Sequence, residues 1–208
     1  VSMRKFDVSF RNDLRKKVEA VESDSGTELV VAILPRSSWY LEYYLGLGAG
    51  LAFLVLTVMM FIPFEIWYVY IYFETIGVGI IGGGLPWLIR PLLRWIVGKK
   101  VIQKRTDRYA RALFHKANIH ETRERVGVLV TLFWLERVAI VMPDKGVVQM
   151  VPPDELEALE VRFNKVFLAD DPPADVLLAL DAFRETMAKY VPAETHPVNE
   201  LPDDLWIE

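Results

Sequence analysis

The chain has 208 residues, of which 52% are hydrophobic, and its 24 Lys and Arg against 28 Asp and Glu give a formal net charge of −4. This length is typical of one or two domains. Because the chain contains no cysteine, disulfide bonds, thiolate metal sites and cysteine nucleophiles are excluded. The charge is unevenly distributed, since residues 88–116 are strongly basic and residues 152–208 are acidic.

Residues 1–40 are predicted to form the first part of an α/β domain. Apolar residues recur at helical spacing from Phe10 to Val21, which predicts a helix over residues 9–22. The segment 28–35 is β-branched, apolar and ended by proline, as expected for a buried strand. Its apolarity is continuous rather than alternating, which indicates a strand covered on both faces.

Two long apolar runs follow within residues 41–98. The first, 43–62, contains no charged residue, and the second, 66–89, contains one acid, Glu74. A helix of about 20 residues, at about 1.5 Å per residue, crosses a hydrocarbon layer of about 30 Å. The remaining residues are too few to bury two helices that are apolar on every face, as a helical hairpin inside a larger soluble protein would require. The sequence therefore predicts a two-helix transmembrane hairpin.

The flanks of these runs predict their orientation. Both flanks are rich in Lys and Arg, whereas the connection at 63–65 has neither, so the positive-inside rule places both termini in the cytoplasm and the protein in the cell's inner membrane. The basic stretch 99–116 begins close behind the second run, and this position favours anionic lipid over nucleic acid as its partner. The headgroups are expected at Arg90, Arg94, Lys99 and Lys100.

Small and acidic residues inside the runs suggest further contacts. Gly46 and Gly50, and likewise Gly79 and Gly83, have the spacing that allows close helix approach, within one chain or between copies in a homo-oligomer. A carboxylate in hydrocarbon costs a few kcal/mol, so Glu74 is expected either to bind a proton or a partner, or to be a protonated acid bonded locally or near the interface of a tilted helix.

Residues 99–191 are predicted to complete the α/β domain. The expected elements are a basic helix at 99–117, with direct continuation from the second apolar run as an option, strands at 126–134 and 138–142, a further short strand at 147–151, and helices at 153–167 and 173–190. Residues 192–208 form an acidic, proline-rich tail expected to be irregular. The predicted fold is a small sheet flanked by helices and interrupted by the hairpin.

Few residues point to catalytic chemistry. His115 and His120, with Glu121 and Glu124, have metal-ligand chemistry, but a spacing of five splays the two histidines around a helix. Asp144 follows a strand in the turn Pro-Asp-Lys-Gly, where loops commonly carry sites. It is either an Asx-type turn residue or a metal ligand.

Three segments carry a resemblance to a known family, the TPM domain. Residues 27–35 resemble its first strand, and residues 123–146 resemble its most recognisable part, a strand, a Glu-Arg turn, a second strand and an Asp-Lys-Gly loop. Residues 199–204 are similar to the ending of a bacterial membrane-anchored branch, in which a two-helix hairpin interrupts the domain after its first strand. The resemblance implies an α/β sandwich.

The resemblance also implies two kinds of function. Some TPM relatives are described as acid phosphatases with metal near acidic loops, and others as accessory or repair factors for membrane complexes. Only Asp144 matches the family's loop aspartate, and residues 6–8 are a weak substitute for the N-terminal acidic motif of the phosphatases. One carboxylate cannot hold a metal and activate water. We therefore expect a non-catalytic accessory or binding role toward a membrane protein. The alternatives are a hydrolase with a divalent metal at Asp144 and an oligomeric transport subunit.

Overall fold

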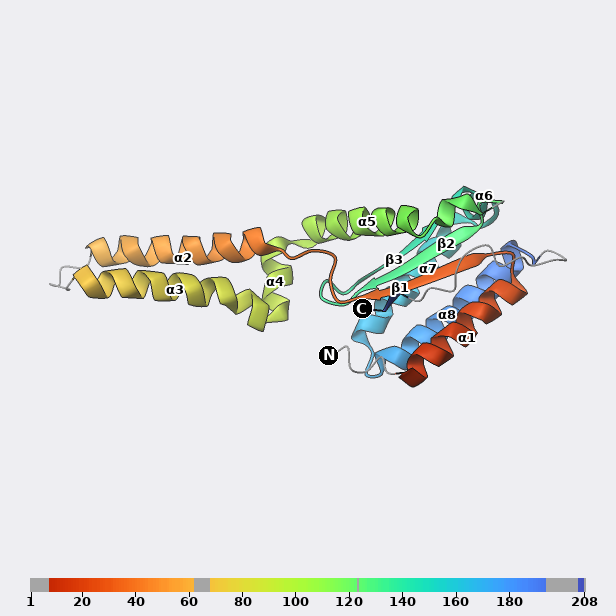
Figure 1. Cartoon of the computed structure of the whole chain (residues 1–208), viewed down its shortest axis with the longest axis horizontal. Coiled ribbons are helices and arrows are strands. Elements are labelled where there is room, and N and C mark those ends of the chain that lie inside the picture. The colour runs from red at the N-terminus through yellow and green to blue at the C-terminus, as the bar shows by residue number, and fades with distance from the viewer. Residues whose placement is uncertain (1–7, 62–67, 123, 194–205, 208) are drawn as a thin grey trace. The chain divides into compact units, whose positions relative to one another are not determined.

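The structure, a computed structural model, describes residues 8–61, 68–122, 124–193 and 206–207. The chain divides into two compact units, one formed by residues 1–37 with 104–208 and the other by residues 38–103. Each unit has its own architecture (Figure 1).

The first unit is built on a mixed sheet with the strand order β3-β2-β1-β4. β1 (Glu28–Leu34) is parallel to β2 (Gly127–Phe133), and β2 is antiparallel to β3 (Val138–Pro143). These three strands confirm the sequence predictions. The two-residue β4 (Trp206–Ile207) adds to the free edge of β1, so the end of the tail is not irregular as expected.

Three helices cover one face of this sheet: α1 (Val8–Asp24), α7 (Pro153–Lys165) and α8 (Pro172–Tyr190) (Figure 1). Their apolar stripes form one buried cluster with alternate residues of the strands. α1, for example, contributes Leu14 and β1 contributes Ile33, and neither side chain is exposed. The helix predictions for this part of the chain are confirmed.

The opposite face of the sheet packs against α5 (Lys99–Lys116). Ala110, Leu113 and Phe114 of this helix form a second buried cluster with the remaining strand residues, including Val30. β1 is therefore covered on both faces, as its continuous apolarity predicted. The result is a three-layer α/β unit with helices on each side of the sheet.

A buried carboxylate ties the end of β1 to the turn between β2 and β3. Glu136 is 4% exposed, and its Oε1 accepts hydrogen bonds from the backbone N–H and the hydroxyl of Ser37 at 2.8 and 2.6 Å. The neighbouring Arg137 has a φ of 56°, which the tight turn requires. These bonds fix the point at which the chain leaves the first unit.

The second unit contains α2 (Leu41–Phe61), α3 (Tyr68–Leu88) and α4 (Arg90–Val97). α2 and α3 pack side by side and antiparallel, because Gly83 lies against Tyr44 whereas Gly79 lies further along α2, against Ala52. The predicted connection at 63–65 lies outside the described residues.

Two local predictions are wrong. α5 does not continue from the second apolar run, because α4 intervenes, starting with Pro91 near its first turn and ending at Gly98, whose φ is 77°. The expected strand at 147–151 is instead part of the short helix α6 (Lys145–Met150). Asp144 initiates this helix, since its Oδ1 accepts a hydrogen bond from the Lys145 N–H at 2.8 Å.

Candidate functional site

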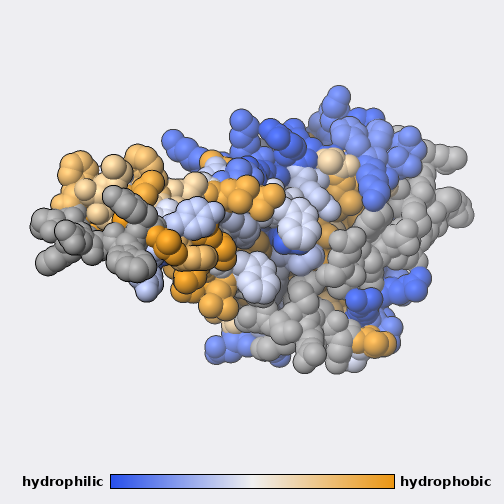
Figure 2. Space-filling model, turned by 60° about the vertical axis from the view of Figure 1, so that its left-hand side comes forward, coloured by the Kyte–Doolittle hydropathy of each residue, from blue (hydrophilic) through white to orange (hydrophobic). Residues whose placement is uncertain are grey.

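The surface of α2 and α3 is apolar and open. Phe53, Met60 and Ile80 are 70%, 77% and 71% exposed, and hydrophobic residues gather over both helices in Figure 2. Contact with water would cost about 25 cal/mol for each Å² of such surface. Both helices are long and apolar enough to cross a membrane. The predicted spans therefore have the composition and the surface that lipid contact requires.

Glycines bring α2 and α3 together. A Cβ atom on Gly48 would lie 2.5 Å from the carbonyl oxygen of Gly79, so only glycine fits at this crossing. Gly79 and Gly83 both face α2, whereas Gly46 and Gly50 have nothing within 4 Å of a Cβ position. The close approach within the chain thus uses one of the two predicted glycine pairs, together with Gly48.

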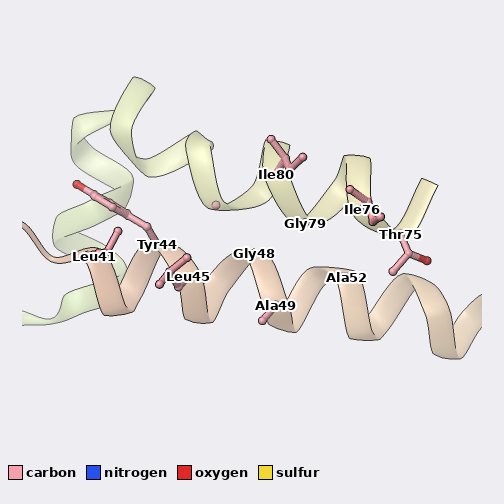
Figure 3. A pocket seen from close by; sticks show the side chains of 11 residues that line it. Leu41, Tyr44, Leu45, Gly48, Ala49, Ala52, Thr75, Ile76, Gly79 and Ile80 are labelled. Atoms are coloured by element: carbon pink, nitrogen blue, oxygen red, sulfur yellow. The ribbon is translucent and has the colours of Figure 1, made fainter. Parts of the chain in front are cut away.

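A shallow apolar groove of about 590 Å³ runs along this pair of helices (Figure 3). Leu41, Leu45 and Ala49 line it from α2, and Ile76 and Ile80 line it from α3. These side chains offer almost no polar atoms. The groove can therefore accommodate hydrocarbon chains, but it lacks the groups that catalysis requires.

Glu74 lies on the exposed surface of α3. Within the part of the chain that the structure describes, its carboxylate makes no hydrogen bond or ion pair. The adjacent Thr75 hydroxyl donates to the carbonyl of Ile71 at 2.7 Å and is not used by Glu74. The local hydrogen bond expected for this acid, to Tyr70 or Thr75, is therefore absent from the described part of the structure.

The basic residues expected at lipid headgroups follow α3. Lys99 and Lys100 are exposed in the first turn of α5, and Arg94 is half-buried in α4. Arg90 is the first residue of α4, and its side chain lies outside the described part of the structure.

Asp144 lies in a pocket with both charged and apolar walls, at the edge of the sheet where β2 begins and β3 ends. Its backbone N–H donates to the carbonyl of Gly127 at 2.9 Å, extending the β2–β3 ladder. The carboxylate is 6% exposed, and its Oδ2 lies 2.9 Å from Nε of Arg125. Oδ1 accepts the bond from the Lys145 N–H, whereas Oδ2 is engaged by the ion pair with Arg125 and accepts no hydrogen bond from the described residues.

The Asp-Lys-Gly loop is pinned by backbone contacts. The N–H of Gly146 donates to the carbonyl of Arg125 at 2.9 Å, and a Cβ atom on Gly146 would lie 2.3 Å from the carbonyl oxygen of Glu124. Arg125 itself has a φ of 59°. The glycine of the motif is therefore required by close packing, and it holds Asp144 and Arg125 side by side.

His115 and His120 come together, contrary to the prediction that their spacing would splay them. α5 ends at Lys116, and Asn118, with a φ of 53°, turns the chain back toward the helix. The two imidazole rings lie 5.0 Å apart between centroids. The prediction assumed a continuous helix, which the left-handed residue breaks.

The pocket around Asp144 combines one carboxylate with several cationic side chains. No group of three His, Asp or Glu side chains that could hold a metal occurs among the described residues. The walls around Asp144 instead carry the cations Arg111, Arg125 and Lys145. The sequence did not predict that these three cations share one pocket, because they come from separate segments. Only Lys145, which lies in the same Asp-Lys-Gly loop as Asp144, could have been placed there from the sequence.

Comparison with known proteins adds evidence on the fold. No protein-family model matches the chain, and no curated protein matches it in sequence. The chain is similar to the NMR structure of BA42 protein from the psychrophilic bacterium Bizionia argentinensis, with a TM-score of 0.58 over 97% of this chain and 94% of that chain. The two sequences are 13% identical, so the likeness concerns the α/β fold alone.

Proposed function

We propose that this chain is a two-pass membrane protein of the inner membrane whose α/β unit is a non-catalytic accessory or binding module for another membrane protein or complex. The observation that carries the proposal is the open apolar surface of α2 and α3, which lie antiparallel and are held together by Gly48, Gly79 and Gly83. In lipid this surface is solvated by acyl chains, and the helices satisfy their own backbone hydrogen bonds.

The basic residues beside the spans support an orientation with both termini in the cytoplasm. Lys99 and Lys100 are exposed just after the second unit's helices, and each contributes about 1 kcal/mol when it lies near anionic headgroups. The connection at 63–65 carries no Lys or Arg, in agreement with its placement on the outer side.

The proposal includes membership in the TPM domain family, in its membrane-anchored branch. Its support is the order of elements: β1, two apolar helices, then the β2–β3 pair with a Glu-Arg turn and the Asp-Lys-Gly loop. An accessory role is preferred to hydrolysis because the Asp144 carboxylate is engaged by Arg125 and the Lys145 N–H, and because the cations around it oppose a divalent metal.

Two measurements on the full-length chain test this proposal. A photo-crosslinking amino acid at Leu168, which is 80% exposed on the α/β unit, should form a discrete adduct with an integral membrane protein in native membranes. The same group at Ser23, on the exposed end of α1, serves as the matched control. The purified protein in detergent should hydrolyse a chromogenic phosphate ester, with Mg²⁺, Mn²⁺, Ca²⁺ or Zn²⁺ added, no faster than its Asp144→Asn variant.

Turnover that depends on Asp144 would contradict the proposal and favour the metal-dependent phosphatase. Adducts made only of further copies of this chain would contradict it in favour of an oligomeric transport subunit.

A further inference from the structure

A second feature of the α/β unit lies outside the proposed accessory role: the pocket of about 510 Å³ around Asp144. This volume is within the range of about 300–1,000 Å³ that is typical of small-molecule sites. Its walls come from the end of α5, the turn after it, the loop before β2, the end of β3 and α6. The charged and titratable groups that line it are Arg111, Arg125 and Lys145, with Asp144, His115 and His120.

We propose that this pocket binds the phosphate group of an organic phosphate. Arg111, Arg125 and Lys145 bring three positive charges to a pocket that contains one carboxylate, so positive charge is in excess without any contribution from the histidines. Neither Arg111 nor Lys145 forms an ion pair with any described residue of the chain. The positive charge is therefore available to an anion.

Arg125 is oriented for this role. Nε of its guanidinium faces Asp144 at 2.9 Å, while the side chain remains 44% exposed, so its other N–H groups are left to a ligand. Its backbone is held in the left-handed region by the bond from the Gly146 N–H to the Arg125 carbonyl. A fixed guanidinium is the donor that matches the oxygens of phosphate, because it donates two parallel hydrogen bonds.

The remaining groups of the pocket decide the class of anion. His115 and His120 line the pocket, and an imidazole carries an N–H donor, whereas Asp144 turns Oδ2 toward Arg125 and Oδ1 toward the Lys145 N–H. Phe114, Met142 and Val148 provide an apolar wall beside the cations, which suits the organic part of a phosphate ester. A phosphate ester can be a small metabolite or the headgroup of an anionic lipid, and both present the same chemistry.

Calorimetric titration of the full-length protein in a nonionic detergent tests this site. The probes are inorganic phosphate, glycerol phosphate and short-chain phosphatidylglycerol. Saturable binding is expected for at least one ester, and Arg111→Gln and Lys145→Gln should each weaken it about tenfold or more. Both side chains are exposed, so neither change disturbs the core.

Arg108→Gln is the matched control, since it removes the same charge from an exposed position of α5 that does not line the pocket. If phosphatidylglycerol binds more tightly than glycerol phosphate, and Arg111→Gln removes this binding, the ligand is a lipid headgroup. If glycerol phosphate binds equally or more tightly, the ligand is a soluble phosphate ester. Absence of saturable binding by every probe, or equal weakening by Arg108→Gln and Arg111→Gln, would overturn the proposal.

Discussion

At the scale of single residues, the partly buried Glu160 makes the stability of the α/β unit depend on pH. Burial raises the pKa of Glu160 on α7, and the nearby carboxylates of Asp107 and Glu157 raise it further, whereas the hydrogen bond from the Val141 N–H opposes this shift. The folded chain therefore binds the Glu160 proton more tightly than the unfolded chain does. As the pH rises through the window above the ordinary pKa of a glutamate, the folded state loses stability relative to the unfolded state.

Glu160→Gln should remove this loss. We expect the melting temperature of the full-length protein in detergent to be higher for Glu160→Gln than for the wild type at pH 7, because glutamine stays uncharged and its amide oxygen can still accept from Val141. The difference should disappear below about pH 4, where a glutamate is protonated in both states. The exposed Glu185→Gln on α8 is the control and should show no such pH dependence. A wild type that equals or exceeds Glu160→Gln at pH 7 would contradict this assignment.

Whole elements differ in how much of their conformation is encoded locally. β1, β2 and β3 and the helices of the α/β unit followed from apolar periodicity and turn residues. The helix α6, which follows β3, could not be predicted in this way. Asp144 caps it, and Gly146 packs on the carbonyl oxygens of Glu124 and Arg125, which belong to the segment before β2. β4 depends on pairing with β1, more than 170 residues earlier in the chain by the sequence numbering.

The packing of α2 on α3 gives a prediction at the same scale. A Cβ atom on Gly79 would lie 3.3 Å from the Cβ of Ala52, close to the distance of about 3.5–4.5 Å found in disulfides. Because the chain has no native cysteine, Ala52→Cys with Gly79→Cys should form a disulfide within single chains under mild oxidation, seen by electrophoresis without reductant.

Gly50→Cys with Gly79→Cys is the matched control, because a side chain at Gly50 has no neighbour within 4 Å and should not reach α3. Disulfide-linked dimers from the Ala52 pair, in place of the closed monomer, would mean that these helices pack between copies and not within one chain.

The binding chemistry of the pocket was less predictable than the fold. The sequence singled out Asp144, His115 and His120, and all three line the same pocket. Arg125 was missed because its left-handed backbone, which brings it to Asp144, is set by the contact with Gly146 and not by local propensity. The charge of the pocket, which decides whether a cation or an anion binds there, depends on side chains from several segments that only the folded chain brings together.

For the whole molecule, the decisive feature is where the second unit enters the chain. β1 and β2 are parallel neighbours, and parallel strands need a long crossover connection, usually helical. α5 covers the sheet as such a crossover helix, and the unit of residues 38–103 is inserted ahead of most of it. The insertion therefore lengthens a connection that the topology already requires, without interrupting any pair of adjacent strands.

The central claim is that α2 and α3 cross the membrane and return, so that residues on both sides of the insertion share one compartment. Single cysteines at Ser23, at Phe64 and at Glu185 in the cysteine-free chain test it directly with a membrane-impermeant maleimide on intact cells. The account predicts labelling of Phe64→Cys from outside, and labelling of Ser23→Cys and Glu185→Cys only after the inner membrane is permeabilised. Labelling of Ser23→Cys and Glu185→Cys from opposite sides, or recovery of the protein from cells without detergent, would contradict it.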